Sequence, residues 1–281
     1  MTGGIQTWTV PATGIYRITA TGAQGASAAT ATYVGGRGAS VQGDFNLTGG
    51  QTLKLAVGQQ GSGQGSGENG GGGGGSFVVT SANVPMLIAG GGGGTRLAAS
   101  QNGCDASVTE YAVTGSDSSS TSSCTLETSD LGLGGIISQS SYGSAGAGFN
   151  GDGATDSAWG DPHGGGYDWA NGMLGGVSTG CGTGYNGGFG GGGDGSGCNG
   201  GGGGGGYSGG DGGWIAGGGG SYNTGSNPVA TAGVGTGDGA IVIESLTTVT
   251  TAIPTLTEWG MIILSSLLAL GALITLRRQR Q

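Results

Sequence analysis

GTGYNGGFGGGGDGSGCNGGGGGGGYSGGDGGWIAGGGG is the stretch from Gly182 to Gly220, in which 25 of 39 residues are glycine. Glycine loses more backbone entropy on ordering than any other residue and brings no side chain to bury. The stretch is therefore either a flexible linker or a set of backbone segments that hydrogen-bond to one another. Polyglycine helices in the polyproline II conformation are the second alternative, because their N–H and C=O groups point sideways and need external partners. The large aromatic residues spaced between 134 and 232 have no use in a linker, and both alternatives stay open on composition alone.

Composition narrows the class of protein. Only 8% of the 281 residues are charged, the formal net charge is −9, and the pI is about 4.2. This balance argues against a nucleic-acid-binding protein, which needs a basic surface to neutralise phosphates. Hydrophobic residues make up 34% of the chain, so the composition is not that of a charge-extended disordered chain either.

Short apolar runs with a period of two predict β-strands on both sides of the glycine-rich region. In Ala39 to Leu47, for example, Ala39, Val41, Phe45 and Leu47 would point inward, and Ser40, Gln42, Asp44 and Asn46 outward. Similar runs occur at 5–10, 15–21, 53–57, 77–79, 84–89 and 240–246. No stretch before Ile253 has the apolar period of a helix. The sequence predicts an all-β sandwich of half-buried antiparallel strands, with a large insertion at about 134–232 before the last strand.

The cysteine pattern favours disulfides over a metal site. The four cysteines are Cys104, Cys124, Cys181 and Cys198; none lies in a C-x-x-C pair, and His163 is the only histidine. Spacing suggests the pairs Cys104–Cys124 and Cys181–Cys198, each closing a loop of about 20 residues and contributing roughly 3 kcal/mol. Four cysteines allow three connectivities, and four free thiols are the alternative. Disulfides would require an oxidising compartment.

Patterns that formally match catalytic or metal sites lack the context such sites need. Gly176-Val-Ser-Thr-Gly180 matches the nucleophile elbow of hydrolases, but no histidine follows it and no strand-to-helix turn is expected there. A metal could be held by Asp161, His163 and Asp168, and calcium by Asp152, Asp156, Asp194 and Asp211, but residues of these types more often cap turns. Asn46-Leu-Thr48 matches the sequence pattern of a glycosylation site, and we interpret the match as incidental. The sequence therefore predicts no catalytic residue, metal or cofactor.

A series of motifs in the first hundred residues resembles a known extracellular domain. The motifs are Gln6-Thr-Trp-Thr-Val-Pro-Ala-Thr-Gly-Ile-Tyr16, Ala20-Thr-Gly-Ala-Gln-Gly25, Gly38-Ala-Ser-Val-Gln-Gly43, Leu53-Lys-Leu-Ala-Val-Gly-Gln-Gln-Gly61, Gly70 to Phe77 and Leu87-Ile-Ala-Gly-Gly-Gly-Gly-Gly94, with Gly237-Asp-Gly-Ala-Ile-Val-Ile-Glu244 near the end. In this order they resemble the glycine-rich domain of the anaplastic lymphoma kinase and leukocyte tyrosine kinase receptors. The resemblance implies a tumour-necrosis-factor-like (jelly-roll) β-sandwich with an inserted bundle of polyglycine helices. The cytokine-binding residues of that family match no motif here, so receptor function is not carried over.

The C-terminal part has the pattern of a membrane-spanning segment. Trp259 to Leu276 is an 18-residue apolar stretch, long enough at ~1.5 Å per residue to cross a bilayer core. Arg277, Arg278 and Arg280 follow it directly. Basic residues stay on the cytoplasmic side, so the residues before Trp259 are expected outside the cytoplasm.

The residues before this stretch resemble the IPTL-type C-terminal sorting signal of Gram-negative bacteria. The matching residues are Ile253, Pro254, Thr255, Leu256, Glu258, Trp259 and Gly260; Thr257 stands where serine is usual. The resemblance implies that an exosortase, a membrane-embedded cysteine transpeptidase, cleaves near the motif and transfers the protein to a surface carrier. It divides the chain into a glycine-rich domain (5–247), a linker (248–252) and a sorting signal (253–281), the last comprising a motif at 253–260, a helix at 259–276 and a basic tail at 277–281.

These patterns together predict a non-enzymatic protein at the cell surface or in the extracellular matrix, with a structural or adhesive role. A surface module that recognises carbohydrate or protein is the alternative, and a secreted hydrolase is a remote third. The expected partners are the sorting enzyme, the membrane before processing, and an extracellular polysaccharide or surface protein. No signal-peptide pattern precedes Gly3, so we expect an export signal encoded upstream of Met1.

Overall fold

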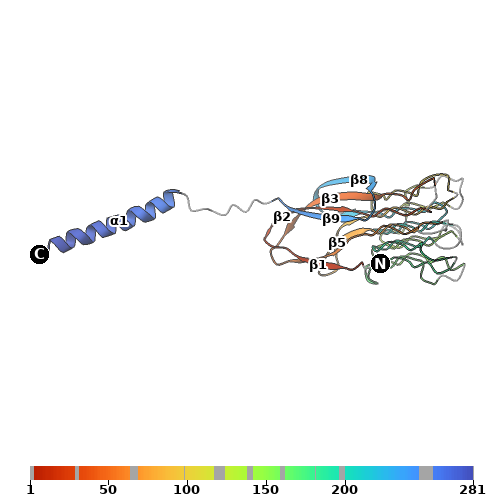
Figure 1. The fold of residues 1–281 in the computed structure, drawn as a ribbon, viewed down its shortest axis with the longest axis horizontal. Coiled ribbons are helices and arrows are strands. Elements are labelled where there is room, and N and C mark those ends of the chain that lie inside the picture. Colours follow the sequence, from red (N-terminus) through yellow and green to blue (C-terminus); the bar gives the residue numbers. More distant parts are fainter. Residues whose placement is uncertain are drawn as a thin grey trace. The chain divides into compact units, whose positions relative to one another are not determined.

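The computed structural model describes residues 3–28, 32–63, 69–97, 99–116, 124–137, 142–158, 162–180, 182–195, 200–246 and 256–280 (Figure 1). It divides into two units, Met1–Leu246 and Thr247–Gln281. The first unit contains the strands β1 (Gln6–Thr9), β2 (Gly14–Thr21), β3 (Gly38–Leu47), β4 (Thr52–Ala56), β5 (Ser76–Thr80), β6 (Pro85–Ala89), β7 (Tyr222–Asn223), β8 (Ser226–Gly235) and β9 (Ala240–Ser245). The second unit contains the helix α1 (Leu256–Arg278).

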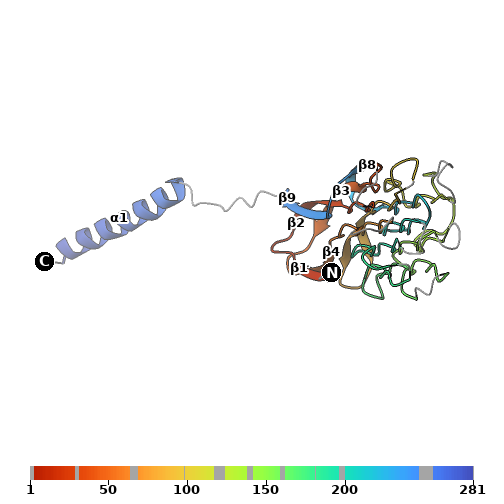
Figure 2. The ribbon, with the colours of Figure 1, turned by 45° about the vertical axis from the view of Figure 1, so that its right-hand side comes forward.

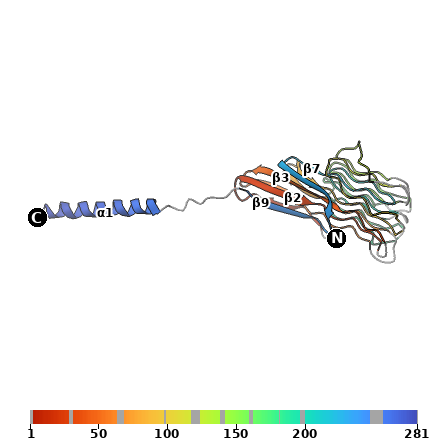
Figure 3. The ribbon, with the colours of Figure 1, turned by 90° about the horizontal axis from the view of Figure 1, so that it is seen from above.

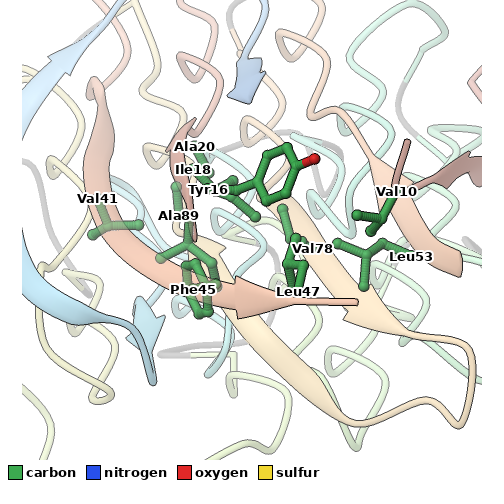
Figure 4. Close-up of a cluster of buried hydrophobic side chains, with 11 residues drawn as sticks. Val10, Tyr16, Ile18, Ala20, Val41, Phe45, Leu47, Leu53, Val78 and Ala89 are labelled. Atoms are coloured by element: carbon green, nitrogen blue, oxygen red, sulfur yellow. The ribbon is translucent and has the colours of Figure 1, made fainter. Parts of the chain in front are cut away.

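The strands form two antiparallel sheets that face each other across one core. The strand orders are β1-β4-β5-β6-β7 and β8-β3-β2-β9. Side chains from both sheets meet in this core, among them Tyr16, Ile18 and Phe45 from one sheet and Leu53 and Val78 from the other (Figure 4). Fully burying an aliphatic or aromatic side chain contributes about 1.5–3 kcal/mol, so this cluster holds the sheets together. The mostly-β class predicted from the sequence is confirmed.

Alternation along β2 decides which of its side chains enter this core. Tyr16, Ile18 and Ala20 are 4%, 0% and 0% exposed, whereas the residues between them lie on the other face of the sheet. Register with β3 places Tyr16 opposite Phe45 and Ala20 opposite Val41, which are both buried. The inward-facing residues predicted for 15–21 and 39–47 are therefore confirmed.

Asp44 is an exception to the predicted alternation. It lies on the outer face of β3, yet it is only 6% exposed. Arg17 Nε donates to Asp44 Oδ1 (2.8 Å), and Asn227 Nδ2 donates to Asp44 Oδ2 (3.0 Å). Hydrogen bonds from Arg17 and then from Asn227 hold the pKa of Asp44 below its usual range. Asp44 therefore lies on the outward face as predicted, but it is buried there because Arg17 and the start of β8 contact it.

Two strands occur in a region that the sequence analysis did not assign to strands. β7 pairs with β6, and β8 pairs with β3 at the edge of the second sheet. Most residues of β8 are exposed, and the strand contains Pro228, a residue confined largely to edge strands. An exposed edge strand built from small and polar residues lacks the apolar alternation on which strand prediction relies.

The middle of the five-stranded sheet, around β5, is buried on both faces, which corrects the expectation of half-buried strands there. Its second face contributes Ala56, Phe77, Val79 and Ile88 to a cluster with Phe149, Trp169, Met173 and Phe189. Trp169 stacks on Phe149 with ring centroids 5.7 Å apart. The aromatic residues between the glycine runs therefore cover the sheet.

Glycine-rich segments, among them Gly70–Gly75, Gly90–Gly94 and Gly200–Gly206, continue beyond the ends of the strands as a set of adjacent traces, here called the glycine-rich layer (Figures 1 and 3). A view turned by 45° shows the same division into strands and glycine-rich segments (Figure 2). Gly200–Gly206 is buried throughout and belongs to none of the strands; its β-type pairing is an isolated bridge between Gly201 and Gly213. Its backbone groups are hydrogen-bonded to neighbouring segments. The flexible-linker alternative is therefore wrong for this run.

About every third N–H group of this run donates to the same neighbouring segment of the chain. From Gly201 to Gly206, the N–H groups donate in turn to the carbonyls of Gly213, Gly70, Ser144, Gly217, Gly73 and Ala147. A second run has the same interval, since Gly91 donates to Gly205 and Gly94 donates to Gly202. An interval of three matches neither the 3.6-residue repeat of an α-helix nor the two-residue repeat of a strand.

Close approach between these segments explains why they consist of glycine. A Cβ atom added to Gly202, Gly204 or Gly205 would lie less than 3.0 Å from the backbone carbonyl of a neighbouring segment. Real Cβ atoms essentially never come so near to another heavy atom. A side chain larger than hydrogen would therefore prevent the backbone-to-backbone hydrogen bonds of the layer.

Candidate functional site

The C-terminal helix α1 is the first candidate. Within it, Gly260–Arg278 has a mean hydropathy of 1.9 and is long and apolar enough to cross a membrane. Three hydroxyl groups donate to carbonyls one turn earlier: Ser265 to Met261, Ser266 to Ile262 and Thr275 to Gly271. The helix can therefore enter an apolar environment without leaving these hydroxyl hydrogens unsatisfied. Arg277 and Arg278 occupy its last turn, where cations complement the helix dipole.

The predicted sorting motif lies at the start of this helix. Ile253, Pro254 and Thr255 fall outside the described residues. The backbone is helical from Leu256 onward, which includes Glu258, Trp259 and Gly260. The roles of these motif residues, and of Arg277, Arg278 and Arg280 as a topology anchor, remain predictions.

One of the two predicted disulfides is present. Cys104 and Cys124 are bonded, with their Cα atoms 5.2 Å apart. The bridge lies beside a small apolar cluster that includes Cys104, Val113 and Ile215. It therefore attaches the segment after Cys124 to the glycine-rich layer. Cys181 and Cys198 lie outside the described residues, so their pairing remains a prediction.

The serine of the sequence that formally matches a nucleophile elbow takes part in the hydrogen bonds of a turn. Ser178 is 2% exposed, and its Oγ accepts a hydrogen bond from the backbone N of Tyr185 (3.1 Å). Ser178 Oγ also donates to Asn186 Oδ1 (3.2 Å). A nucleophile needs a neighbouring base and access to substrate, and these contacts instead close the loop between Ser178 and Asn186.

The candidate metal ligands mostly fix local backbone. Asp168 accepts from the backbone N of Asn171 (2.9 Å), and Asp152 accepts from the backbone N of Asp168 (2.7 Å). Asp156 and Asp194 are buried, and Asp161 lies outside the described residues. Within the described ranges, no group of three or more His, Cys, Asp or Glu side chains could hold a metal ion.

His163 lines a cavity of about 400 Å³ together with Gly3, Tyr167, Leu174, Gly175, Val177, Asn186 and Phe189. The Tyr167 hydroxyl lies 3.2 Å from His163 Nδ1. Leu174 and Val177 are about half exposed, so the cavity combines an apolar wall with a few polar groups. Such a combination is typical of small-ligand sites.

Asp211, one of the candidate calcium ligands, and Glu127, which the sequence analysis did not single out, line a second cavity of about 290 Å³. Burial, followed by the negative charge of Asp211, raises the pKa of Glu127 to about 8. Burial also raises the pKa of Asp211, whose Oδ1 accepts from the backbone N of Ile136 (2.9 Å). The two carboxyl groups lie far apart in the sequence and share no motif, so no local pattern could have revealed the pair.

The comparison with protein families identifies the C-terminal segment. Residues 251–279 match the family model described as the IPTL-CTERM motif. The match contains the predicted motif and the whole of α1, and it does not extend into the β-rich unit. The chain thus carries a C-terminal segment similar to the IPTL-CTERM motif, which suggests a surface-sorted protein processed by an exosortase.

Proposed function

We propose that this chain is an exported, non-enzymatic protein of a Gram-negative bacterium, which an exosortase-like transpeptidase sorts to the cell surface, where it has a structural or adhesive role. The observation that carries the proposal is the IPTL-CTERM match at 251–279. That match coincides with an apolar helix that ends in Arg277 and Arg278. The motif, the helix and the basic end occur in the order that a sorting signal requires.

Helix length and charge support a defined topology before processing. The 19 residues of Gly260–Arg278 span roughly 28 Å at ~1.5 Å per residue, close to the thickness of a bilayer core. The arginines would hold the C-terminus in the cytoplasm, which places the glycine-rich unit on the opposite side. The Cys104–Cys124 disulfide agrees with that side being oxidising.

We also propose the finer fold implied by the receptor resemblance, a tumour-necrosis-factor-like jelly roll with inserted polyglycine helices. Two antiparallel sheets facing across one core support the first part. The roughly three-residue hydrogen-bonding interval of Gly201–Gly206 supports the second, because a polyproline II helix has three residues per turn. A crystal structure in which this run departs from three residues per turn would overturn it.

A structural or adhesive role suits a rigid module with a tail for surface attachment. The closest resemblance to a catalytic motif, at Ser178, is tied into a turn by Tyr185 and Asn186. Deleting the encoding gene is expected to lower surface attachment or biofilm formation of the producing bacterium. Unchanged attachment would contradict the adhesive role, while turnover of esters, peptides or glycans by the purified protein would contradict the non-enzymatic one.

Replacing Pro254 and Trp259 together by alanine tests the sorting signal. The double variant is expected to accumulate as an unprocessed, membrane-retained precursor, because the motif is what the transpeptidase would recognise. Immunoblots of membrane and released fractions measure this. Thr257→Ser is the matched control, since it moves the motif towards its usual residue and should be processed like the wild type. Equal processing of the double variant would refute the proposed signal.

A surface ligand-binding module is the second candidate, and the cavity beside His163 favours it. Its wall of Tyr167, Leu174 and Val177 could contact the apolar face of a sugar ring or of a protein side chain. Binding of neutral monosaccharides that is lost in Tyr167→Ala would support this function. Its absence, together with normal sorting, would leave the structural role.

A further inference from the structure

Lys54 is the only lysine in the chain, and its side chain contacts a carboxamide. Nζ of Lys54 lies 2.7 Å from Oδ1 of Asn83. The same oxygen accepts a second hydrogen bond, of 3.1 Å, from Nε1 of Trp169. A primary amine and an indole N–H thus converge on one amide oxygen, and neither the sorting signal nor the cavities use these three residues.

Regular elements hold the three groups in place. Lys54 lies in β4, where it is paired with Val79 of β5. Asn83 lies in the tight turn between β5 and β6, and its backbone N donates to the carbonyl of Thr80 (3.0 Å). Asn83 has a φ of 62°, a left-handed conformation that asparagine tolerates better than most residues. The backbone positions of Lys54 and Asn83 are therefore fixed relative to each other.

Trp169 is fixed equally well. It is 7% exposed and packs between Phe77 and Phe149, with ring centroids at 6.1 and 5.7 Å. Lys54 is two residues from Ala56 in β4, so both side chains leave the same face of the sheet, the face that Trp169 covers. The Trp169 N–H is therefore held at the amide oxygen by core packing.

This arrangement contains the elements of an amide-forming reaction. A neutral lysine amine is a nucleophile towards carbonyl carbon. A hydrogen-bond donor fixed at the carbonyl oxygen stabilises the negative charge that develops there during attack. The amide nitrogen Nδ2 of Asn83 is the group that can leave. Attack would require Nζ to move from Oδ1 to the adjacent Cγ, which rotations within the lysine side chain allow.

We propose that Lys54 and Asn83 condense to form an intramolecular isopeptide bond. Nζ of Lys54 loses a proton to solvent and attacks Cγ of Asn83, and the carbonyl electron pair moves onto Oδ1, where Trp169 donates its N–H. The electron pair on Oδ1 then re-forms the carbonyl bond. The Cγ–Nδ2 bond breaks, and Nδ2 takes up a proton from solvent. The attacking nitrogen releases its extra proton, so the products are one amide bond and one ammonia. No oxidant, metal or cofactor takes part.

The bond would join β4 covalently to the turn between β5 and β6. β4 and β5 are already paired in the five-stranded sheet. The cross-link would close the chain between residues 54 and 83 into a ring. A sheet closed in this way cannot be unravelled from its β4 side by pulling, which suits a protein displayed at a surface.

Intact mass spectrometry of the full purified chain tests the proposal. After reduction of its disulfides, the wild type is expected to be lighter than its sequence by the mass of one ammonia. Lys54→Arg keeps the charge and the hydrogen-bond donors but removes the amine nucleophile, so it should keep its full mass. Asn83→Ala should also keep its full mass. Trp169→Phe retains an aromatic ring but lacks the N–H and should form the bond more slowly; formation at the wild-type rate would overturn the role of Trp169.

Ammonia loss alone is not sufficient evidence, because Asn-Gly pairs such as Asn102–Gly103 lose the same mass when they form a succinimide. Tandem mass spectrometry of a proteolytic digest distinguishes the two outcomes. A branched peptide that joins Lys54 to Asn83 confirms the cross-link. Linear peptides alone, after prolonged incubation of the folded wild type in alkaline buffer, would overturn the proposal.

Discussion

In the sandwich core, Ile18, Leu53 and Val78 are buried together through their side chains. In the glycine-rich layer, Gly204 donates to Gly217 and accepts from Gly210 through backbone atoms alone. The first region excludes water with apolar surface, at about 25 cal/mol per Å² buried. The second has almost no side-chain surface and depends on hydrogen bonds worth about 0.5–1.5 kcal/mol each.

This difference implies that opposite substitutions damage the two regions. Removing atoms leaves a cavity in the sandwich, whereas adding one carbon atom to the glycine layer pushes two backbones apart. The two regions also depend on each other, because the aromatic residues between the glycine runs cover the second face of the five-stranded sheet. Four measurements test this difference between the two regions.

Phe77→Ala is expected to cause the largest loss. Phe77 is fully buried in β5, at the contact between the sheet and the aromatic cluster of Trp169. Removing a buried phenylalanine side chain typically lowers the free energy of unfolding by about 3–5 kcal/mol. Chemical denaturation of the folded unit measures the change. A loss no larger than that of an exposed site such as Val84→Ala would contradict the idea that side chains join the two regions.

Gly204→Ala is expected to cost about 3 kcal/mol or more, the upper part of the range for overpacked sites. The added Cβ would meet the backbone carbonyl of Gly91, which hydrogen bonds hold in place. Gly4→Ala is the matched control, because nothing lies within 4 Å of a Cβ at that position. Equal unfolding midpoints for the two variants would show that the glycine layer is not closely packed.

Removing the disulfide by the double variant Cys104→Ser, Cys124→Ser is expected to cost about 3 kcal/mol or slightly less, the chain-entropy value for a loop of this size. The loss should appear first in the glycine-rich layer, since Cys104 packs against Val113 and Ile215 there. Hydrogen exchange followed by mass spectrometry locates it. Uniform loss of protection across β2 and β3 as well would show that the regions unfold as one unit.

The last measurement concerns Glu127, whose effect is a dependence of stability on pH. Because its pKa is raised to about 8 in the folded chain, the folded state keeps a proton that the unfolded state loses near pH 4.5. The stability contributed by this carboxyl group is therefore complete below pH 4.5 and declines as pH rises to about 8.

Thermal melts between these pH values should show a falling midpoint in the wild type and a flatter profile in Glu127→Gln. Glu110→Gln is the control, since Glu110 is an exposed glutamate in the same unit and should not flatten the profile. A wild-type midpoint that stays constant or rises over this range would contradict the raised pKa of Glu127.

Strands with one buried and one solvated face were predictable, because their apolar residues alternate. β2 and β3 are the clearest cases. The edge strand β8 was missed, since it is exposed almost throughout and has no alternation to detect. The burial of Asp44 was missed for the same reason, because it depends on β8. The apolar helix and the sorting motif were predictable, since both are continuous in the sequence.

Local sequence patterns were therefore enough to predict the strands of the sandwich core, the C-terminal apolar helix and its similarity to a sorting signal. Each of these follows from residues that are near one another along the chain. Only the tertiary structure decided that the glycine runs are an ordered layer, because their hydrogen bonds join Gly204 to Gly217 in one direction and Gly91 to Gly205 in another. Glycine carries no side-chain pattern from which such partners could be inferred. The meeting of Lys54, Asn83 and Trp169 likewise exists only because β4, a turn and the glycine-rich region converge on one face of a sheet.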